Sequence, residues 1–555
     1  MNGFAAGGLL FASAFLAGTL QAKVVDVAPS GGNDTPHITA AVAALKDGDT
    51  LRFAKGTYHF HPDGAMRRRL LPCGSTGGER SVAMCFEDLS DIVIDGGGAS
   101  FVWHGDISPF AFLRCRRIEA GNFSSTLNRT SVIELVVETK DDEGFVLSAT
   151  GRDVCLRDGA LVFKTDLGEF SSALDGRISL HAISRMLIGY LFVGDAPGPR
   201  TGLPSWHMNA DAEALGDGRY RFRYRSGDPA AVKCPYETGE LLGVNTEMKR
   251  ERCTVLCEDC SDVTFRDVTM RRGGGMGIVA QQCENMTLER FRVIPEPGER
   301  VSLTADCIFL VNCRGRVQVT DCDIGHAFDD AMNCHGNYTR VGKAEGGSVR
   351  VSLCHPRHRF AMPFRRGDRV EFIDSQTLAV VCSRDVAEVG AVSEDGMSVD
   401  LGFSEPLPVL SPGTLVEDVS AHPDVTIRGC RFHDTMHLRL SGRGKYLVES
   451  NRFERGSGLI VIDLFKYWGE AGRISDMVVR NNVFRDFNSM SGSAFISAGV
   501  SGFGENAPLV HRGLVITNNV YSGLVDKFTR LRGTDGAVVR DNREISGDDR
   551  RISVQ

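Results

Sequence analysis

Short stretches with β-strand character recur along most of the chain. Each stretch has two or three apolar or β-branched residues at its centre, which is typical of a half-buried strand. Clear examples begin at Val263, Met286, Val317, Val425, Leu447, Met477, Leu514 and Val538. Neighbouring stretches lie roughly 20 to 40 residues apart, which is the spacing of a coiled repeat with loops of variable length. The pattern predicts an all-β fold, a right-handed parallel β-helix.

Polar residues that follow these strands predict the bends between them. Examples are Arg480-Asn481-Asn482, Thr517-Asn518-Asn519 and Arg540-Asp541-Asn542. Asn and Asp adopt left-handed backbone angles more readily than most other residues, so they suit tight bends. We therefore expect asparagines of successive coils to stack in ladders, and inward apolar residues to stack over those of the previous coil.

The repeat weakens in two places, where longer alternating stretches favour antiparallel strands. We expect inserted β-barrel-like or sandwich domains at 118–248, which holds Val132–Val137 and Tyr220–Tyr224, and at 339–420, which holds Gly367–Phe372. The β-helix would then divide into an N-terminal cap with the first coils, a middle part and C-terminal coils. These parts are 23–117, 249–338 and 421–555.

The N-terminal part contains an export signal and a short helix. An apolar run from Phe4 to Leu20 is followed by Gln21-Ala22, which suits cleavage near Ala22, so we expect residues 1–22 to be removed and the protein to be periplasmic or secreted. An uncleaved N-terminal anchor is the alternative. The pattern at 36–46 predicts an amphipathic helix, with Thr35 as its N-cap, that closes the end of the coil stack.

Composition and charge limit the classes of function. The chain has 555 residues, 42% hydrophobic residues and 63 glycines, so it can bury a large core. Its net charge of −8 gives no electrostatic reason to expect nucleic acid. Cys257 and Cys260 form a C-x-x-C without a second pair at zinc-finger spacing. We expect most of the 16 cysteines to be buried thiols, although an exported protein permits a few disulfides.

Three aspartates give the chain its candidate chemistry. Asp306 precedes the pair Asp329-Asp330 by 23 residues, about one coil, and adjacent parallel strands are about 4.8 Å apart. The three carboxylates would therefore converge, and their repulsion would raise the pKa of at least one of them. A protonated carboxyl beside an ionised one is the general acid and base pair of glycoside hydrolysis. A solvated turn or a calcium site is the alternative reading.

The segments around these aspartates, Ala305-Asp306-Cys307 and Asp329-Asp330-Ala331-Met332-Asn333-Cys334-His335-Gly336, resemble glycoside hydrolase family 110. This family contains exo-acting α-1,3-galactosidases that act on blood group B type glycans, and the resemblance covers nearly the whole mature chain. It implies an inverting mechanism without a cofactor or metal. It also implies Asp306 as the general acid, with Asp329 and Asp330 holding and activating water. Whether linear substrates are accepted, and whether the protein forms homo-oligomers, stays open.

Other residues are candidates for substrate binding. Asn333 and His335 follow the aspartate pair, and Trp468 and Glu470 lie on a later coil, where an aromatic face and a carboxylate suit a sugar. Arg439 and Arg300 are included because their coils should neighbour the site. Packing or surface roles are the alternatives for all of them.

Two other functions fit a β-helix with an outward aspartate pair. Polygalacturonase-like hydrolases also carry such a pair followed by His-Gly, but the Arg-x-Lys element they use is not found after Gly336. A non-catalytic glycan-binding β-helix is the second alternative. It predicts that substitution of the aspartates leaves binding unchanged.

Overall fold

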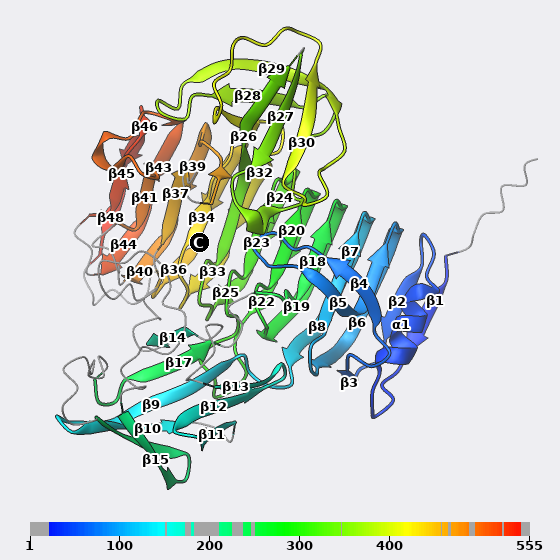
Figure 1. The fold of residues 1–555 in the computed structure, drawn as a ribbon, viewed down its shortest axis with the longest axis vertical. Helices are drawn as coiled ribbons and strands as arrows, with labels where there is room; N and C mark the ends of the chain where they lie inside the picture. The colour runs from blue at the N-terminus through cyan, green and yellow to red at the C-terminus, as the bar shows by residue number, and fades with distance from the viewer. Residues whose placement is uncertain are drawn as a thin grey trace, which may run out of the picture.

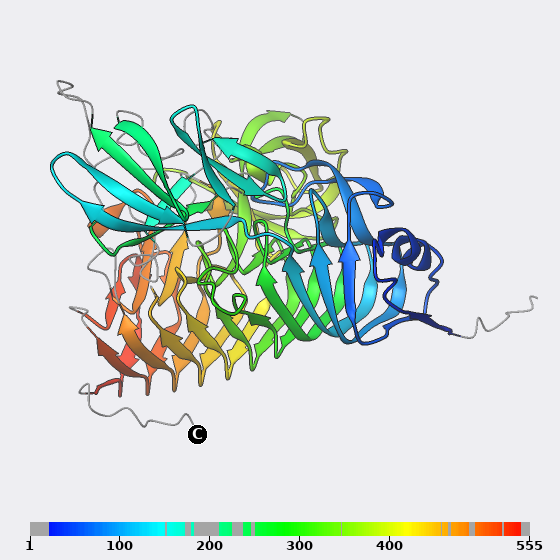
Figure 2. The same cartoon turned by 90° about the horizontal axis from the view of Figure 1, so that it is seen from below.

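The computed structural model describes residues 22–149, 153–171, 179–182, 210–224, 237–245, 250–345, 347–456, 458–463, 468–487, 494–523 and 527–545. Within these residues the chain winds into a parallel β-helix from which two antiparallel domains project (Figure 1). The strands of successive coils lie side by side along the stack when the molecule is viewed from below (Figure 2). The predicted fold class is therefore confirmed.

Three ladders of parallel strands form the faces of the β-helix. The first runs through β5 (Gly78–Glu87), β7 (Ser108–Leu113), β18 (Val255–Glu258), β20 (Ile278–Gln281), β23 (Ile308–Val311), β26 (Met332–Glu345), β34 (Leu438–Leu440), β37 (Leu459–Asp463), β41 (Ile496–Val500) and β45 (Thr529–Leu531). The second runs through β1 (Val24–Val27), β2 (Thr50–Phe53), β6 (Ser90–Trp103), β8 (Arg116–Leu127), β19 (Ser261–Arg272), β21 (Glu284–Glu289), β24 (Arg314–Thr320), β32 (Asp424–Arg428), β35 (Lys445–Glu449), β39 (Asp476–Arg480), β43 (Leu514–Thr517) and β47 (Val538–Arg540). The third begins with β3 (Thr57–Phe60), shares β6, β8 and β19, and continues through β22 (Arg292–Val293), β25 (Asp323–Gly325), β33 (Arg431–His433), β36 (Arg452–Glu454), β40 (Val483–Phe487), β44 (Val520–Gly523) and β48 (Arg543–Glu544).

All eight predicted strand centres lie on the second ladder, but two of them begin one residue off the register. Val425 pairs with Tyr446, so Tyr446 and Val448 point into the core and Leu447 is only half-buried. Val538 is shifted in the same way, because it pairs with Val515 and not with Leu514, where the preceding predicted stretch begins. A shift of one residue along a strand moves every side chain to the opposite face, so the inward residues of β35 are not those that the sequence pattern favoured.

Asparagines form the predicted ladder at the bend before the third face. The side-chain carbonyl of Asn482 accepts the backbone N–H of Asn451 at 2.9 Å, and Asn519 and Asn542 repeat this contact along the stack. The residues just before them, Asn481, Asn518 and Asp541, have φ values of 54° to 58°. The left-handed conformation and the stacked amides that we predicted are therefore both present.

Cysteines occupy bends in earlier coils: Cys322 and Cys430 lie at the bend of the asparagine ladder, whereas Cys115, Cys260 and Cys283 lie at the bend between the first and second faces. The backbone N–H of Cys322 points to the sulfur of Cys430 at 3.4 Å, and that of Cys115 points to Cys260 at 3.3 Å. Burial raises the pKa of Cys283 to about 11, so this thiol stays protonated at neutral pH. These cysteines are free thiols in the structure and pack as small hydrophobes, as we predicted.

Helix α1 (Thr35–Ala43) lies at the N-terminal end of the stack, where Ile38 and Val42 join the main core. The predicted range of 36–46 is too long at its C-terminus, and Thr35 is not the N-cap. Asp34 precedes the helix as N-cap, while Thr35 is already helical and its hydroxyl donates to the carbonyl of His61. Among the described residues, no helix is long and apolar enough to cross a membrane.

The first inserted domain, here called insert 1, is a sandwich of antiparallel strands. Its strands are β9 (Val132–Lys140), β10 (Gly144–Ala149), β11 (Val154–Arg157), β12 (Ala160–Thr165), β13 (Gly168–Ser171), β14 (Ser179–Ala182), β15 (Ala210–Gly216), β16 (Arg219–Tyr224) and β17 (Leu241–Asn245). A six-stranded and a three-stranded sheet share one apolar core. Insert 1 begins later than residue 118, because β8 continues the parallel ladder to Leu127.

The second inserted domain, insert 2, is a closed antiparallel barrel. The end of β26 pairs with β27 (Ser348–Leu353), and the ring continues through β30 (Ser398–Phe403), β29 (Val380–Val389), β28 (Arg369–Ile373) and β31 (Leu415–Asp418) back to β26. In Figure 1 the strands β23, β26 and β34 lie between insert 2 above and insert 1 below. The first face of the β-helix is therefore flanked by both inserts at this point.

Candidate active site

The coil register brings the three predicted aspartates together on two neighbouring coils. Ile308 pairs with Met332, so Asp306 lies level with Asp330, one coil away, and the repeat here is 332 − 308 = 24 residues. The backbone N–H of Cys307 donates to the carbonyl of Asp330 at 2.9 Å. One carboxylate oxygen from each of Asp306, Asp329 and Asp330 lies within 4.8 Å of the others. The predicted convergence of carboxylates is what the register produces.

These carboxylates are withdrawn from solvent, and their acidity changes accordingly. Asp306 and Asp330 are 3% and 2% exposed. Burial raises the pKa of Asp306 well above its usual value, and the negative charge of Asp329 raises it further. Burial also raises the pKa values of Asp329 and Asp330, but Arg250 and Arg439 oppose this rise. Asp306 is thus the carboxyl that holds a proton most readily.

Two arginines supply counter-charges to the aspartates. The Arg439 Nε donates to Asp330 at 3.0 Å, and Arg250 contacts Asp306 at 3.4 Å and also donates to Asp329. We predicted Arg439 from its coil, which pairs Arg439 with Asn333. Arg250 was not predicted. It lies just after insert 1, where neither the repeat nor a motif indicates a position in space.

The segment before β34 supports the aspartate pair from the next coil. The Thr435 hydroxyl and the Met436 N–H both donate to the Asp329 carbonyl, at 2.7 and 3.2 Å. The backbone N–H of His437 points to the Asp330 carboxylate at 3.3 Å. Both aspartates are therefore fixed by backbone groups as well as by side chains.

Four further predicted residues line the same part of the first face. Asn333 and Arg439 are register neighbours, and the short strand β38 (Glu470–Ala471) pairs with β26 so that Glu470 reaches His335. The His335 Nε2 and Glu470 Oε1 atoms are 3.7 Å apart, too far for a hydrogen bond. Burial lowers the pKa of His335, which keeps its ring neutral.

One polar atom on each of these four residues is buried and has no hydrogen-bond partner among the described residues. The atoms are Asn333 Oδ1, His335 Nε2, Arg439 Nη1 and Glu470 Oε2. A buried polar atom left unpaired costs about 1–3 kcal/mol, so such groups rarely gather without a ligand to satisfy them. Together they offer both donors and acceptors, which suits a ligand that carries several hydroxyl groups.

Trp468 lies at the edge of this cluster. Its ring is 4.1 Å from that of His355 and 6.2 Å from that of His358, both in the segment of insert 2 around the short 3₁₀ helix Pro356–His358. His358 in turn lies 6.0 Å from His335. Trp468 therefore joins insert 2 to the site. Arg300 instead pairs with Glu134 of insert 1, with their charged groups 3.1 Å apart.

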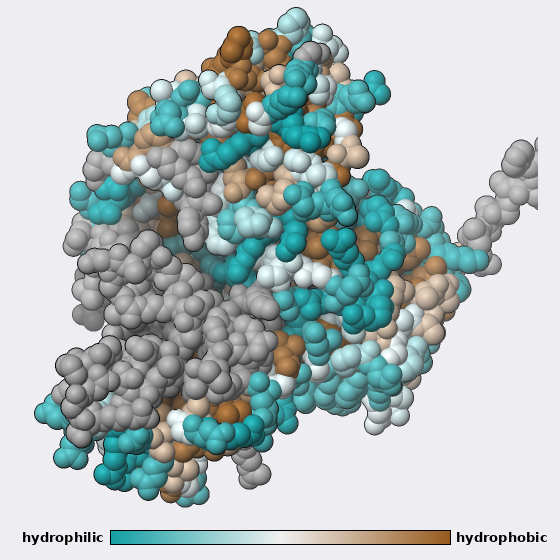
Figure 3. Space-filling view, in the orientation of Figure 1, coloured by the Kyte–Doolittle hydropathy of each residue, from teal (hydrophilic) through white to brown (hydrophobic). Residues whose placement is uncertain are grey.

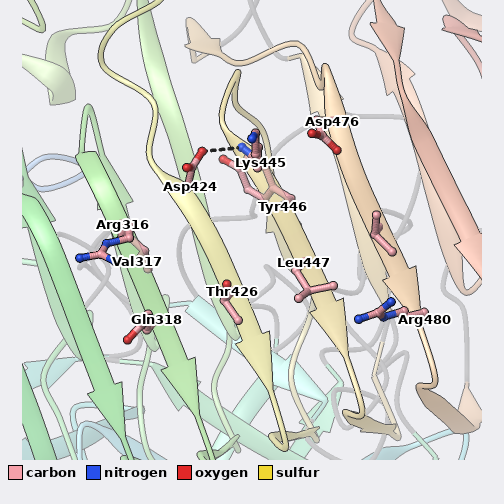
Figure 4. A pocket seen from close by; sticks show the side chains of 11 residues that line it. Arg316, Val317, Gln318, Asp424, Thr426, Lys445, Tyr446, Leu447, Asp476 and Arg480 are labelled. Atoms are coloured by element: carbon pink, nitrogen blue, oxygen red, sulfur yellow. Dashed lines mark hydrogen bonds between the residues drawn. The ribbon is translucent and has the colours of Figure 1, made fainter.

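The groove shown in Figure 4 is a separate feature. It has a volume of about 440 Å³ and lies on the outer face of the second ladder, over β24, β32, β35 and β39. Arg316, Thr426, Leu447 and Arg480 are among its lining residues. It contains none of the three aspartates. In the view of Figure 3, the described surface between the two inserts is mainly pale to hydrophilic.

The three aspartate oxygens are also close enough to share a metal ion. Arg250 and Arg439 already pair with these carboxylates, which reduces the negative charge available to a cation. In this structure the three aspartates are thus ion-paired with Arg250 and Arg439.

Comparison with known proteins gives relatives over most of the chain. Alpha-1,3-galactosidase A of Streptomyces avermitilis is 27% identical over 82% of this chain and 76% of its own length. Alpha-1,3-galactosidase B of Bacteroides thetaiotaomicron is 24% identical over 82% and 73%. Alpha-1,3-galactosidase A of Shewanella woodyi is 26% identical over 84% and 76%. These relatives confirm the resemblance that the aspartate motif indicates. No family model matches the chain.

The solved structures found by comparison are more distant from this chain. The A-module of the mannuronan C-5 epimerase AlgE4 of Azotobacter vinelandii is 9% identical over 94% of this chain and 96% of that module, with a TM-score of 0.28. The family 28 exopolygalacturonase of Yersinia enterocolitica is 10% identical over 95% of this chain and 79% of its own, with a TM-score of 0.32.

Proposed function

We propose that this chain, a relative of the bacterial α-1,3-galactosidases, is an exo-acting glycoside hydrolase that releases terminal α-1,3-linked galactose. The proposal rests above all on four buried polar atoms that have no hydrogen-bond partner within the described part of the chain; they belong to Asn333, His335, Arg439 and Glu470. They lie beside three converging carboxylates, so a site for hydroxyl groups adjoins a site for proton transfer.

The aspartates have different roles in the proposed reaction. Asp306, whose pKa is raised most, donates a proton to the glycosidic oxygen as the bond to the leaving sugar breaks. Asp329 and Asp330 lie beside arginines that favour their ionised forms, so they accept a proton from the attacking water. Water thus supplies the new hydroxyl at the anomeric carbon, and the proton balance of the site is restored by exchange between the carboxyls and solvent.

Inversion at the anomeric carbon is part of the proposal and rests on the family resemblance. Inverting enzymes usually hold their two carboxyl groups about 6.5–9.5 Å apart, which leaves room for the water. The nearest oxygens here lie within 4.8 Å. This is a distance between single oxygens and is shorter than the separation of the carboxyl groups themselves. We propose that the acid and the base move apart to the inverting range when the sugar and water enter.

Glycans of the blood group B type are the proposed substrates. The site presents both donors and acceptors for hydroxyl groups, and its two arginines are paired with aspartates. This arrangement suits a neutral galactose better than the carboxylate of a galacturonan. Side-by-side assays with fucosylated and linear α-1,3-galactosides would define how much of the glycan is recognised.

The test is galactose release from a terminal α-1,3-galactoside, with the first-formed anomer followed by NMR. We expect free β-galactose from the wild type and about 1000-fold slower release from Asp306→Asn. A first-formed α-anomer would overturn inversion. If no galactose is released while galacturonan gains new reducing ends, the protein is a polygalacturonase-like enzyme. If neither substrate is cleaved but the glycan still binds, it is a glycan-binding protein.

We also propose that the protein is exported after cleavage near Ala22. Residues 1–21, which hold most of the expected signal, lie outside the described residues. N-terminal sequencing of the protein from the periplasm or culture medium should begin at Lys23, whereas an intact Met1 would contradict cleavage.

A further inference from the structure

Arg250 occupies a special place in the chain. It lies between the end of β17 at Asn245, in insert 1, and the return to the β-helix at β18. Its backbone is left-handed, with a φ of 55°. A Cβ atom at Gly275 would lie only 3.2 Å from the Arg250 Cα, so a glycine on the next coil allows this close approach.

The backbone that follows Arg250 is anchored to the β-helix. Arg252 forms an isolated bridge with Gly274, and its guanidinium donates to the Gly105 carbonyl at 2.8 Å. The position of Arg250 is thus set by the first coil after the insert. The start of this coil therefore places a cation beside carboxylates that all belong to later coils.

The guanidinium of Arg250 reaches two carboxylates with different proposed roles. It contacts Asp306, the acid, at 3.4 Å and donates to Asp329, one of the bases. The planar guanidinium has five N–H donors in a fixed arrangement, so it can bind two carboxylates at once and hold them at a set spacing. While the guanidinium contacts both side chains, Asp306 and Asp329 are held close together. Hydrolysis requires the sugar and a water molecule to lie between the acid and the base.

We propose that Arg250 is a positioning residue that sets the spacing of acid and base. It holds Asp306 and Asp329 together in the free enzyme. When the terminal sugar enters, the guanidinium turns its donors to the sugar hydroxyls, and the two carboxylates separate to the distance that the reaction needs. This inference rests on the proposed function.

The charge of Arg250 gives the movement a chemical consequence. In the free enzyme the guanidinium lowers the pKa values of Asp306 and Asp329 against the effect of burial. When the guanidinium leaves Asp306 for the sugar, this carboxyl becomes a weaker acid. Sugar binding would thus favour the protonated form of Asp306, which is the form that hydrolysis requires.

The test compares Arg250→Gln, Arg250→Lys and the control Arg300→Gln. Arg300 also lies next to insert 1, but it pairs with Glu134 and not with the aspartates. We expect Arg250→Gln to lower kcat/KM about 100-fold, the effect of removing one well-placed charged donor. Both limbs of its pH profile should move to higher pH, because neither aspartate then has this cation beside it. Arg250→Lys should keep the pH profile of the wild type and lose mainly kcat.

Two results would overturn the inference. One is a fall in activity for Arg250→Gln without a shift of the pH profile. The other is an equal fall in activity for Arg300→Gln, which would show that Arg250 acts only by anchoring insert 1.

If the wild type releases no galactose, the proposed function fails, and the pairing of Arg250 with the aspartates is then tested by urea unfolding. Arg250→Gln should then lose more stability at pH 8 than at pH 5, because the unpaired carboxylates are charged at pH 8, and an equal loss would contradict its pairing with them.

Discussion

Two sets of buried polar side chains differ in how their hydrogen bonds are made: the asparagines at the bends of the β-helix, and the polar residues beside the carboxylates, such as Asn333 on β26 and Glu470 on β38. In the asparagine ladder, each of Asn451, Asn482 and Asn519 accepts and donates hydrogen bonds along the stack. At the carboxylate site, by contrast, Asn333 and Glu470 each keep a buried oxygen without a partner among the described residues. The first set completes its hydrogen bonds within the fold, and the second has groups that the proposed sugar substrate would satisfy.

The difference follows from what each coil contributes. When successive coils place the same residue at the same position, each amide meets an identical partner one strand away, and the pairing repeats. When they place Phe309, Asn333 and Arg439 in register, unlike groups meet and none completes the others. In this protein the ladder of identical residues completes its own hydrogen bonds, while the unlike residues beside the carboxylates leave polar atoms without a partner among the described residues.

The largest effect is expected at the carboxylate site. Asp306→Asn and Asp330→Asn should each lower galactose release about 1000-fold, because a proton donor or acceptor is lost. Thermal unfolding should show that both variants stay folded. Asp424→Asn is the matched control, since Asp424 lines the groove of the second ladder and should leave activity unchanged. Comparable activity of all three variants would remove the aspartates from the mechanism.

The asparagine ladder should respond in stability and not in catalysis. Asn482→Ala removes the acceptor of the Asn451 N–H and the donor to the Val448 carbonyl, both at 2.9 Å. Because buried partners are left unpaired, we expect a loss of about 1–3 kcal/mol in the free energy of unfolding, measured in urea. Thr426→Ala on the outer face serves as control. A fall in kcat for folded Asn482→Ala would contradict the separation of the two sets.

Glu470 should respond in substrate affinity. Glu470→Gln keeps the shape of the side chain and removes its charge, so a charge-assisted hydrogen bond to a sugar hydroxyl is weakened. We expect KM to rise about tenfold, which corresponds to about 1.4 kcal/mol, with a smaller change in kcat. Glu449→Gln, on the ion-paired edge of β35, should leave KM unaltered. An unchanged KM for Glu470→Gln would place the substrate elsewhere.

The smallest expected effect is a pH dependence of stability. Burial raises the pKa of Asp306 above that of the unfolded chain, so the folded state binds this proton more tightly. The stability of the wild type therefore falls as pH rises from the unfolded pKa to the folded pKa. Asp306→Asn does not have this proton, so its stability relative to the wild type should increase between pH 4 and pH 7. Parallel urea titrations at both pH values would show this, and a constant difference would contradict it.

Much of the fold follows from local pattern. The strand centres, the bends at Asn481 and Asn518 and the placement of two inserts are all readable from residue type and spacing. The errors at Tyr446 and Leu127 are errors of register and boundary, since an alternating stretch does not show which face turns inward or where a parallel strand ends. Of the site, Asp306 and the pair Asp329-Asp330 were predicted to meet because the 23 residues from Asp306 to Asp329 are about one coil of the repeat.

The sequence alone determined the repeat, the ladders and the convergence of three carboxylates, because these depend on a period that one chain carries in its own spacing. Only the tertiary structure placed Arg250 between Asp306 and Asp329 and brought Glu470 to His335. Arg250 returns from an insert, and Glu470 lies on a strand that pairs antiparallel to β26 outside the coil register. Neither position follows from the period, so their contacts depend on how separate segments pack in space.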